Sequence, residues 1–444
     1  MSPEEKIYTI KLAPPPPQLP IHGRDNPEEV SFIGRTNYEG ALDVKKFIFG
    51  IRREDRRRHV YMVGKTGVGK SRAIELLIRQ DVAHGYGLCL IDPYGDAIDA
   101  VIDFIPEERV SDVVVIDPLD QAVVPSCNPF WQVKHESRYQ SAQALIEIIQ
   151  KQSIPFWNPQ TEYLLRWVLL ALFEYPGATL QSVVHMFTEA SSREDILKYV
   201  KDEVVGKFWS NEYELWRDKF GTEAVIPIIN ALSYVLFHPL LRNMFNQPGR
   251  DIDFASLLQA KKIVLVHLRR ATIGQSGADF LGALLIARLY QATVGAGRVT
   301  AKTAQDFYLY IDEFHHFITP TFMSLFSEAS RYGLCLTLAH QYLTQLSVDV
   351  RAAILGTVGT IKVFRVNGED ALRLEQEFSP IFKAKDMMNL GRNEFYIKML
   401  VAGEASDPFS AEELKIFPPP YSSRRNEVIS SSREYLSRQN SLQV

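Results

Sequence analysis

One short segment of the chain has the residue types that bind a polyphosphate. It consists of eight consecutive residues: Gly64, Lys65, Thr66, Gly67, Val68, Gly69, Lys70 and Ser71. They match the pattern GxxxxGK[ST], whose glycines let the backbone curl so that its N–H groups point at phosphate oxygens. Lys70 can then reach the β- and γ-phosphates, and the Ser71 hydroxyl can bind Mg²⁺. The segment predicts a site for ATP and Mg²⁺.

The residues on either side of this segment support the same interpretation. Residues 60–63 form an apolar run typical of a buried strand, and residues 74–78 have the apolar positions of an amphipathic helix. A strand that leads through such a loop into a helix is the context in which the motif binds phosphate, because the helix N-terminus adds positive potential. The alternative, a chance glycine-rich turn, is disfavoured by these flanks.

A second apolar run, residues 307–311, ends in two adjacent acids, Asp312 and Glu313. We predict that Asp312 holds Mg²⁺ and that Glu313 orients or deprotonates the water that attacks the γ-phosphate. The alternative is a solvated acidic turn, which the presence of a phosphate-binding loop disfavours. His315 and His316 follow, but one pair of adjacent histidines is more typical of a structural role, and neither is assigned to the site.

Three further residues have two interpretations each. Asp92 also ends an apolar run, so it either lies near the γ-phosphate or only forms a turn before Pro93. Gln341 follows the apolar run after Glu313, where it either senses the γ-phosphate or simply ends a strand. Arg331 precedes that run and should face away from its own nucleotide. It either reaches the site of a neighbouring subunit or complements the dipole at a helix C-terminus.

The elements that must position these residues predict an α/β fold. The strand-like runs are mostly continuous and apolar, as in a sheet that helices cover on both faces, and helical patterns separate them, which indicates a mainly parallel sheet. They cover residues 60–63, 88–91, 113–116, 263–266, 307–311, 334–338, 360–366 and 395–400.

The organisation of the chain changes along its length. Residues 1–30 are expected to be an N-terminal extension with four consecutive prolines, and residues 31–130 the first part of the α/β core. Residues 131–249 show helical patterns and no convincing strand, which predicts an all-α insertion. Residues 250–416 complete the core. Residues 417–444 are expected to form a flexible tail, because residues 421–444 carry seven serines and four arginines with little apolar content.

Composition narrows the possible functions only slightly. The apolar fraction is 46% and the formal net charge is −4, so the overall charge does not favour nucleic-acid binding. The basic run 52–58 is interpreted as a solvated face, with contact to DNA, adenine or another subunit as alternatives.

Three cysteines, two of them in buried runs, indicate a reducing compartment. The longest apolar stretch is too short to cross a bilayer, so we expect a cytoplasmic protein with no transmembrane segment, possible docking at a membrane being left to partners.

Six sequence blocks together resemble the HerA/FtsK superfamily of pumping ATPases, and most closely the type IV coupling proteins of conjugation and secretion. The blocks are residues 59–71, 90–96 (LIDPYGD), 113–120 (VVVIDPLD), 128–130 (NPF), 310–317 (YIDEFHHF) and 330–346 (SRYGLCLTLAHQYLTQL). The helical insertion resembles the all-α domain of these proteins, so that the resemblance covers roughly residues 31–416. Two features depart from the usual pattern of the family: we expect no N-terminal transmembrane helices in this sequence, and Tyr94 stands where histidine or lysine is common.

The resemblance implies a hexameric ring around DNA that is driven by ATP hydrolysis. In such a ring Lys70, Ser71, Asp312 and Glu313 form the nucleotide site, Arg331 acts on the neighbouring subunit, and Gln341 is the sensor. The sequence therefore predicts a RecA-like ATPase core with an all-α insertion, which moves DNA in conjugative transfer or type IV secretion. Two alternatives stay open: a HerA-like helicase in DNA-end processing, and a pilus-assembly or protein-export ATPase that does not act on DNA.

Overall fold

The protein is described by a computed structural model that covers residues 10–38, 46–131, 133–248, 251–295 and 306–442. The strands within these residues form one twelve-stranded sheet in the order β2-β1-β12-β10-β9-β3-β8-β7-β4-β6-β5, with β11 paired to β10. Their bounds are β1 (Val30–Thr36), β2 (Ile48–Arg52), β3 (Val60–Val63), β4 (Gly87–Asp92), β5 (Val113–Ile116), β6 (Ile263–His267), β7 (Phe307–Ile311), β8 (Leu334–His340), β9 (Thr360–Val363), β10 (Glu394–Val401), β11 (Glu404–Ala405) and β12 (Phe409–Glu412).

The part of the sheet from β9 to β5 is parallel, and the part from β9 to β2 is antiparallel. The predicted α/β class with a mainly parallel sheet is therefore confirmed. All eight predicted strand runs are strands in the structure, whereas β1, β2, β11 and β12 were not predicted. These four strands lie in the antiparallel part, where the side chains are less uniformly apolar.

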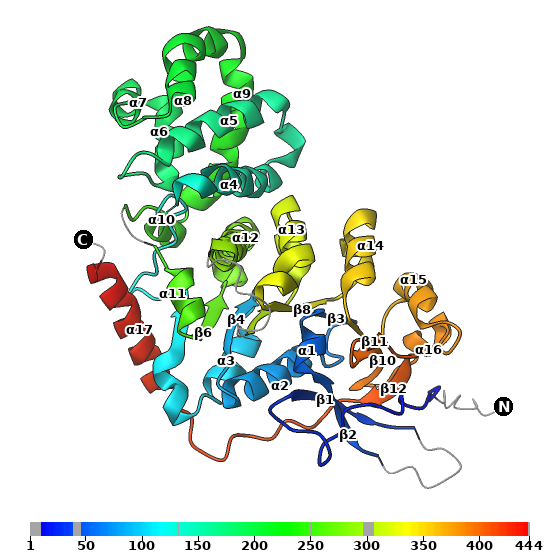
Figure 1. Ribbon diagram of the computed structural model, residues 1–444. Helices are drawn as coiled ribbons and strands as arrows, with labels where there is room; N and C mark the ends of the chain where they lie inside the picture. Colours follow the sequence, from blue (N-terminus) through cyan, green and yellow to red (C-terminus); the bar gives the residue numbers. More distant parts are fainter. Residues whose placement is uncertain (1–9, 39–45, 132, 249–250, 296–305, 443–444) are drawn as a thin grey trace, which may run out of the picture.

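Helices cover both faces of the sheet (Figure 1). Their bounds are α1 (Arg53–Arg56), α2 (Lys70–Ala83), α3 (Asp96–Ile102), α4 (Arg138–Gln152), α5 (Pro159–Leu172), α6 (Leu180–Thr188), α7 (Ala190–Leu197), α8 (Glu203–Lys207), α9 (Tyr213–Leu236), α10 (Pro239–Phe245), α11 (Phe254–Gln259), α12 (Arg270–Gly295, broken at Gly274), α13 (Pro320–Glu328), α14 (Val348–Thr357), α15 (Gly368–Phe378), α16 (Ala384–Met388) and α17 (Arg425–Leu442).

The alternation of side chains along β3 shows how the two faces are used. Val60 and Met62 belong to the hydrophobic cluster beneath α2 and α3, whereas Tyr61 and Val63 belong to the cluster that includes α12 and α13. Successive residues of a strand point to opposite faces, so a strand covered on both sides must be apolar throughout. This requirement explains the continuous apolar runs in the sequence.

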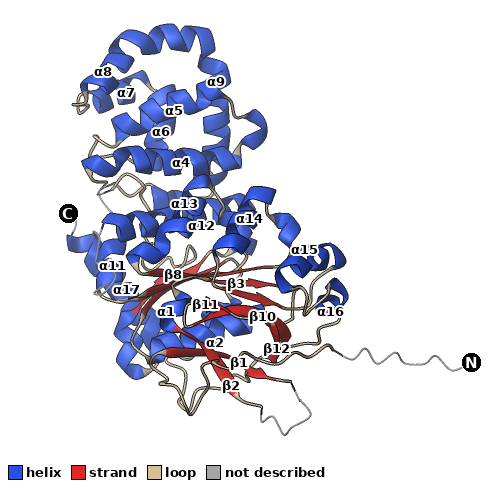
Figure 2. Ribbon diagram, turned by 45° about the vertical axis from the view of Figure 1, so that its right-hand side comes forward, coloured by secondary structure: helices blue, strands red, loops and turns tan. Residues whose placement is uncertain are grey.

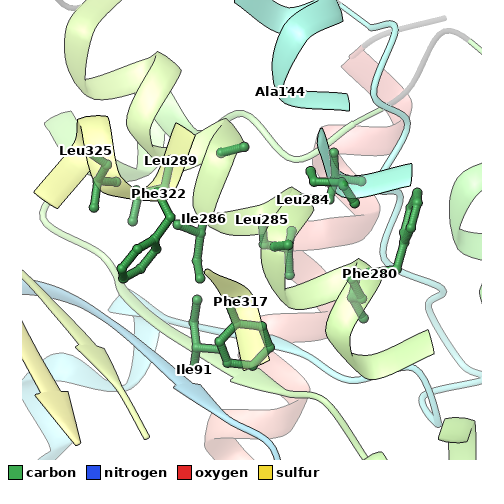
Figure 3. Close-up of a cluster of buried hydrophobic side chains, with 14 of the residues drawn as sticks. Ile91, Ala144, Phe280, Leu284, Leu285, Ile286, Leu289, Phe317, Phe322 and Leu325 are labelled. Atoms are coloured by element: carbon green, nitrogen blue, oxygen red, sulfur yellow. The ribbon is translucent and has the colours of Figure 1, made fainter. Parts of the chain in front are cut away.

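Between β5 and β6 the described residues contain helices and no strand that belongs to the sheet. Helices α4–α9 rise as a separate layer above α12 and α13, within the interval 131–249 where the sequence predicts an all-α insertion (Figure 2). The junction is apolar. In Figure 3, Ala144 of α4 lies above Leu284 and Leu285 of α12, and Ile91 of β4 lies beside Phe317 on the other side of α12. The hydrophobic core is therefore continuous from the sheet into the insertion.

The basic run 52–58 is not a solvated face, and this expectation was wrong. Arg53 and Arg56 are buried and both form ion pairs with Asp81 of α2, at 2.9 and 2.7 Å. Arg56 also donates to the hydroxyl of Tyr310, which lies on β7. Burial of two arginines is tolerable here because one fully buried carboxylate and the tyrosine hydroxyls satisfy them. These two arginines hold α1, α2 and β7 together.

The C-terminal segment is also not the flexible tail that its composition suggests. Helix α17 packs along β5, an edge strand (Figure 1). Val428, Ser432 and Leu436 are buried and four residues apart, so they lie on one face of the helix. The Ser432 hydroxyl accepts a hydrogen bond of 2.8 Å from the Val115 N–H, an edge group that would otherwise have no strand beside it. The helix forms because it covers this edge.

The predicted N-terminal extension is partly anchored to the sheet. Ala13 and Leu19 are buried, and the Ala13 N–H donates to the Ser410 hydroxyl of β12. Residues 1–9 of the extension and residues 443–444 of the predicted tail lie outside the described residues. Among the described helices, none alone is long and apolar enough to cross a membrane, although the pair Glu203–Leu236 and Pro239–Phe245, bent by 106°, together reaches that length and composition.

Candidate nucleotide site

The phosphate-binding loop has the backbone that its glycines predict. Gly67 and Gly69 have φ angles of 77° and 129°, a region that residues with a Cβ atom rarely adopt. The Lys65 N–H donates to the Arg365 carbonyl after β9 at 2.9 Å, and the Asn393 N–H donates to the Val68 carbonyl at 3.2 Å. The loop is thus attached to the C-terminal end of β9 and to the start of β10. Helix α2 begins at Lys70, so its N-terminus is formed by the last two residues of the loop segment.

The Lys70 side chain folds back onto its own loop. Its Nζ donates to the carbonyl oxygens of Gly64 at 2.6 Å and Lys65 at 3.1 Å. Burial lowers the pKa of Lys70. The nearby carboxylates of Asp312 and Glu313 act in the opposite direction but only partly offset this effect. The ammonium group is therefore held at the mouth of the loop, in a setting where the negative charge of a phosphate would stabilise it further.

The loop meets the acidic end of β7. The Ser71 hydroxyl donates to Asp312 Oδ2 at 3.1 Å, across 241 positions of sequence. Burial raises the pKa of Asp312 to about 7, and the neighbouring carboxylates of Glu313 and Asp92 add to the rise. A hydroxyl and a crowded carboxylate are the hard oxygen donors that Mg²⁺ prefers, and the cation would relieve the repulsion between the acids. The residues present therefore fit Mg²⁺.

The remaining ligands of such a cation would have to come from nucleotide and water. No group of three or more His, Cys, Asp or Glu side chains in the described part of the chain could hold a metal ion. This agrees with the usual behaviour of Mg²⁺, which keeps several waters and binds through one or two protein groups plus substrate phosphates.

Glu313 is held beside Asp312 by both its backbone and its side chain. Its φ angle is 49°, in the left-handed region, and its N–H donates to Asp312 Oδ1 at 2.9 Å. Its Oε1 accepts a hydrogen bond of 2.8 Å from Gln341 Nε2. Burial raises the pKa of Glu313, although Gln341, Lys70 and Arg270 oppose the rise. A carboxylate with a raised pKa can accept a proton from water more readily than an exposed one can.

Asp92 ends the strand next to β7, and each of its carboxylate oxygens already accepts a backbone hydrogen bond. Its Oδ1 accepts from the Tyr94 N–H at 2.8 Å, and its Oδ2 accepts from the Ala97 N–H at 2.9 Å. Of the two interpretations made from the sequence, these bonds correspond to the turn. The turn also needs a glycine, because a Cβ on Gly95 would lie 1.9 Å from His267 Nε2.

Arg331 lies apart from the other predicted site residues. It is exposed and precedes β8, whereas Gln341 follows the other end of the same strand. The structure therefore brings five predicted site residues together: Lys70, Ser71, Asp312, Glu313 and Gln341. Arg331 lies at the opposite end of β8.

A cation that was not assigned to the site lies closer to it. Arg270, at the start of α12, is near enough to Glu313 to lower the pKa of that carboxyl, and it forms an ion pair of 2.6 Å with Asp279. The sequence shows Arg269 and Arg270 only as a basic pair after a strand. The signal that could have assigned Arg270 to the site is its position just after β6, which lies two strands from β7 in the sheet.

The insertion touches the segment that directly follows the acids. From α4, Lys151 Nζ donates to the carbonyl oxygens of His316 at 2.5 Å and Ile318 at 3.1 Å. One turn earlier, Glu147 Oε2 accepts from the Thr321 N–H at 2.7 Å, at the start of α13. Burial lowers the pKa of Lys151 to about 8. Nothing in the sequence pattern distinguishes these two charged residues from others on the helices of the insertion.

The fold and the loop geometry together define a P-loop nucleotide site in a RecA-like core. A glycine-rich loop leads from a central strand into a helix, and its serine meets an acid from another strand of the same parallel sheet.

The comparisons with known proteins agree with this class. A family model described as the type IV secretion-system coupling protein DNA-binding domain matches residues 48–216. The unbound bacterial conjugative coupling protein TrwBdeltaN70 is similar with a TM-score of 0.63 and 14% identity, over 84% of this chain and 88% of that chain. The plasmid coupling protein TrwB in complex with ADP and Mg²⁺ is similar with a TM-score of 0.64 and 14% identity, over 85% and 90% of the two chains.

A third structure has a related fold. VirB4 of Thermoanaerobacter pseudethanolicus is similar with a TM-score of 0.57 and 12% identity, over 87% of this chain and 96% of that chain. No curated protein sequence matches the chain. The resemblance inferred from the sequence blocks is thereby confirmed: the chain has a P-loop ATPase fold like that of the type IV secretion coupling proteins.

Proposed function

We propose that this chain is an ATP-hydrolysing motor that moves DNA in conjugative transfer or type IV secretion. The observation that supports hydrolysis is the convergence of Ser71, Asp312 and Glu313 at the phosphate-binding loop. The support for DNA as the substrate is the match of residues 48–216 to the DNA-binding domain of coupling proteins. Movement of DNA requires contact with its phosphate backbone and no reading of its sequence.

In this proposal each side chain at the loop has one task. Lys70 leaves the carbonyl oxygens of Gly64 and Lys65 and binds the β- and γ-phosphates of ATP. Ser71 and Asp312 hold Mg²⁺, which supplies charge neutralisation at the phosphates when it is bound. Glu313 orients the attacking water and accepts its proton, while Gln341 keeps Glu313 in place and links it to the state of the γ-phosphate.

The position of Arg331 supports a ring as the active form. An exposed arginine at the end of β8 away from the nucleotide loop cannot reach the site of its own subunit. In a ring it can reach the nucleotide bound by the neighbouring subunit. We therefore propose a homo-hexamer, which docks to a secretion or conjugation complex at the membrane. The test is to mix Arg331→Ala with Lys70→Ala subunits. We expect the mixture to have more ATPase activity than the sum of the two inactive preparations. A mixture with no such excess activity would refute action across an interface.

The proposed substrate is tested by ATP turnover with and without DNA. Hydrolysis that depends on Mg²⁺ and rises on addition of single- or double-stranded DNA at low salt is expected, and Lys70→Ala should abolish it in both conditions. Binding to DNA phosphates releases counterions, and this release is less favourable at high salt concentration, so the stimulation should decline with added salt. Turnover that DNA does not change would refute the DNA part of the proposal.

A pilus-assembly or protein-export ATPase that does not act on DNA is the second candidate. The observation that favours it is that several basic residues are paired with acids of the same chain: Arg53 and Arg56 bind Asp81, Arg269 binds Asp117, and Lys262 binds Asp112. The formal net charge is also −4. This candidate predicts turnover without DNA stimulation, so the same experiment separates the two.

A further inference from the structure

A connected row of polar side chains lies behind Glu313. The Tyr61 hydroxyl is 2.6 Å from His340 Nε2, and His340 Nδ1 is 3.2 Å from Gln345 Oε1. Gln345 Nε2 is 3.1 Å from His315 Nε2, and His315 Nδ1 is 3.4 Å from Glu313 Oε2. The row runs from a buried tyrosine on β3 to the carboxylate that is proposed to activate water.

The directions of the hydrogen bonds in this row follow from one backbone group. The Tyr342 N–H can only donate, and it lies 3.0 Å from the side-chain oxygen of Gln345. That contact assigns the oxygen and nitrogen of the Gln345 amide, so its Nε2 must face His315 and donate to His315 Nε2. A neutral imidazole that accepts at Nε2 carries its proton on Nδ1. His315 therefore presents an N–H to Glu313.

In the part of the chain that the structure describes, the two facing atoms have no other hydrogen-bond partner. Within the described residues, Glu313 Oε2 and His315 Nδ1 are both buried and neither makes a hydrogen bond. Burial lowers the pKa of His315 to about 4, and the charges of Arg270 and Lys151 act in the same direction, so the ring is neutral near pH 7. The two atoms are 3.4 Å apart but are not aligned for a hydrogen bond, and catalytic contacts are often poorly aligned before substrate binds.

We propose that His315 is a positioning residue for Glu313, with its Nδ1–H holding Oε2 while Gln341 holds Oε1. This inference rests on the proposed hydrolysis of ATP at Glu313. A carboxylate that is held at both oxygens cannot rotate, and it still has lone pairs free to accept a proton from water. Gln345 acts one step further away, because it selects the His315 tautomer that can donate.

The competing explanation is that His315 only fills space. Its ring lies against the ring of His316, with centroids 3.8 Å apart, and both histidines are similarly buried. The His316 backbone N–H donates to the Glu313 carbonyl oxygen at 3.1 Å, but its side chain faces another acid, with Nδ1 3.8 Å from Asp279 Oδ1. His316 is therefore a matched control for the packing role of a histidine at this place.

The first experiment compares turnover and nucleotide affinity in three single variants. His315→Phe keeps a ring and removes the donor, and we expect kcat to fall about 10–100-fold, as for other groups that orient a reacting side chain, with an unchanged Kd for a fluorescent ATP analogue. His315→Asn places an amide near the position of Nδ1, and we expect it to recover most of the lost kcat. His316→Phe should stay close to the wild type.

These outcomes separate a positioning role from a structural one. Loss of kcat without rescue by His315→Asn, or equal losses in His315→Phe and His316→Phe, would overturn the proposal. Absence of ATP hydrolysis by the wild type would refute the proposed function and this inference together, whereas wild-type hydrolysis with an unaffected His315→Phe variant would refute the inference alone.

The second experiment tests the tautomer. Gln345→Met removes the amide and is expected to lower kcat in the wild-type background, since His315 can then protonate at either nitrogen. In the His315→Asn background no tautomer exists, so the same substitution should have a clearly smaller effect. Any loss that comes only from the missing bond to Tyr342 would be equal in both backgrounds, and equal effects would contradict the role given to Gln345.

Discussion

Two neighbouring strands of the sheet end in acids that the structure uses in different ways. β4 and β7 are parallel, with Ile91 opposite Ile311, so that Asp92 and Asp312 follow at the same level. Both Asp92 oxygens accept backbone N–H groups of the turn and of α3. Asp312 instead bonds to the Ser71 hydroxyl and to the N–H of Glu313. The same pattern of an apolar run and an acid therefore gives one structural carboxylate and one that is available to a ligand.

The difference arises in the residues that follow each strand. After Asp92, Pro93 and Gly95 form a tight turn that aims the first N–H groups of α3 back at the carboxylate. After Asp312, Glu313 adopts a left-handed backbone and adds a second negative group. A carboxylate that accepts several N–H groups is satisfied, whereas one that faces another carboxylate needs a cation. The turn after a strand, more than the acid itself, thus decides the use of the acid.

The largest effect is expected at Glu313. Glu313→Gln preserves the shape of the side chain and its contact with Gln341 but removes the proton acceptor, so kcat for ATP hydrolysis should fall about 10²–10⁴-fold. Binding of ATP should persist, measured with a fluorescent analogue in the presence of Mg²⁺. Unchanged turnover would show that Glu313 is no more involved in the chemistry than Asp92.

A smaller effect, and one that depends on pH, is expected at Asp312. Its pKa is about 7 in the folded protein, against ~3.9 for an unfolded aspartate. The unfolded chain therefore releases this proton first as pH rises, and the free energy of unfolding of the nucleotide-free protein should decrease between about pH 4 and pH 7 through this group. Asp312→Asn cannot ionise, so its stability relative to the wild type should increase over that range by on the order of 2–4 kcal/mol.

Thermal or denaturant unfolding of both proteins at pH 5 and pH 8 measures this difference. A constant offset between the wild type and Asp312→Asn at the two pH values would contradict the raised pKa. The same variant should bind Mg²⁺ and ATP more weakly, since the carboxylate is the proposed partner of the cation.

The smallest effect is expected at Asp92. Asp92→Asn keeps one oxygen for the Tyr94 N–H but places an amide group against the Ala97 N–H, so we expect a loss of about 1–2 kcal/mol in stability. ATP turnover measured below the unfolding temperature should stay within roughly threefold of the wild type, about 0.7 kcal/mol in activation free energy. A loss of turnover as large as that of Glu313→Gln would erase the distinction between the two strand ends.

The sequence was most informative where the pattern is local. The apolar runs predicted all eight strands that were assigned, because strands covered on both faces must be apolar, and the spacing of the glycines predicted the loop backbone. Helix α17 was missed although Val428, Ser432 and Leu436 have helical spacing, because seven serines dominate the composition of that segment. Four strands of the antiparallel part, β1, β2, β11 and β12, were missed because their side chains are not continuously apolar.

The sequence was least informative where a partner is distant. Nothing near Arg56 reveals that Asp81 and Tyr310 will bury it, and nothing near His315 reveals that Gln345 will orient its ring. Charged and polar side chains take their roles from groups brought together by the whole sheet. The roles of Lys70, Ser71, Asp312, Glu313, Arg331 and Gln341 in catalysis stay predictions, while the structure places all but Arg331 in one site.

The strand order also determines when the nucleotide loop can form during synthesis of the protein. β3 carries the loop, but its two neighbours in the sheet are β8 and β9, and Tyr61 is 279 positions away from His340. At roughly 5–20 residues per second, the ribosome needs roughly 15–55 s to make the intervening chain. During that time the apolar β3 has no strand on either side, so an N-terminal fragment that contains the whole loop should neither fold alone nor bind nucleotide, and the growing chain depends on protection from aggregation until β8 and β9 emerge.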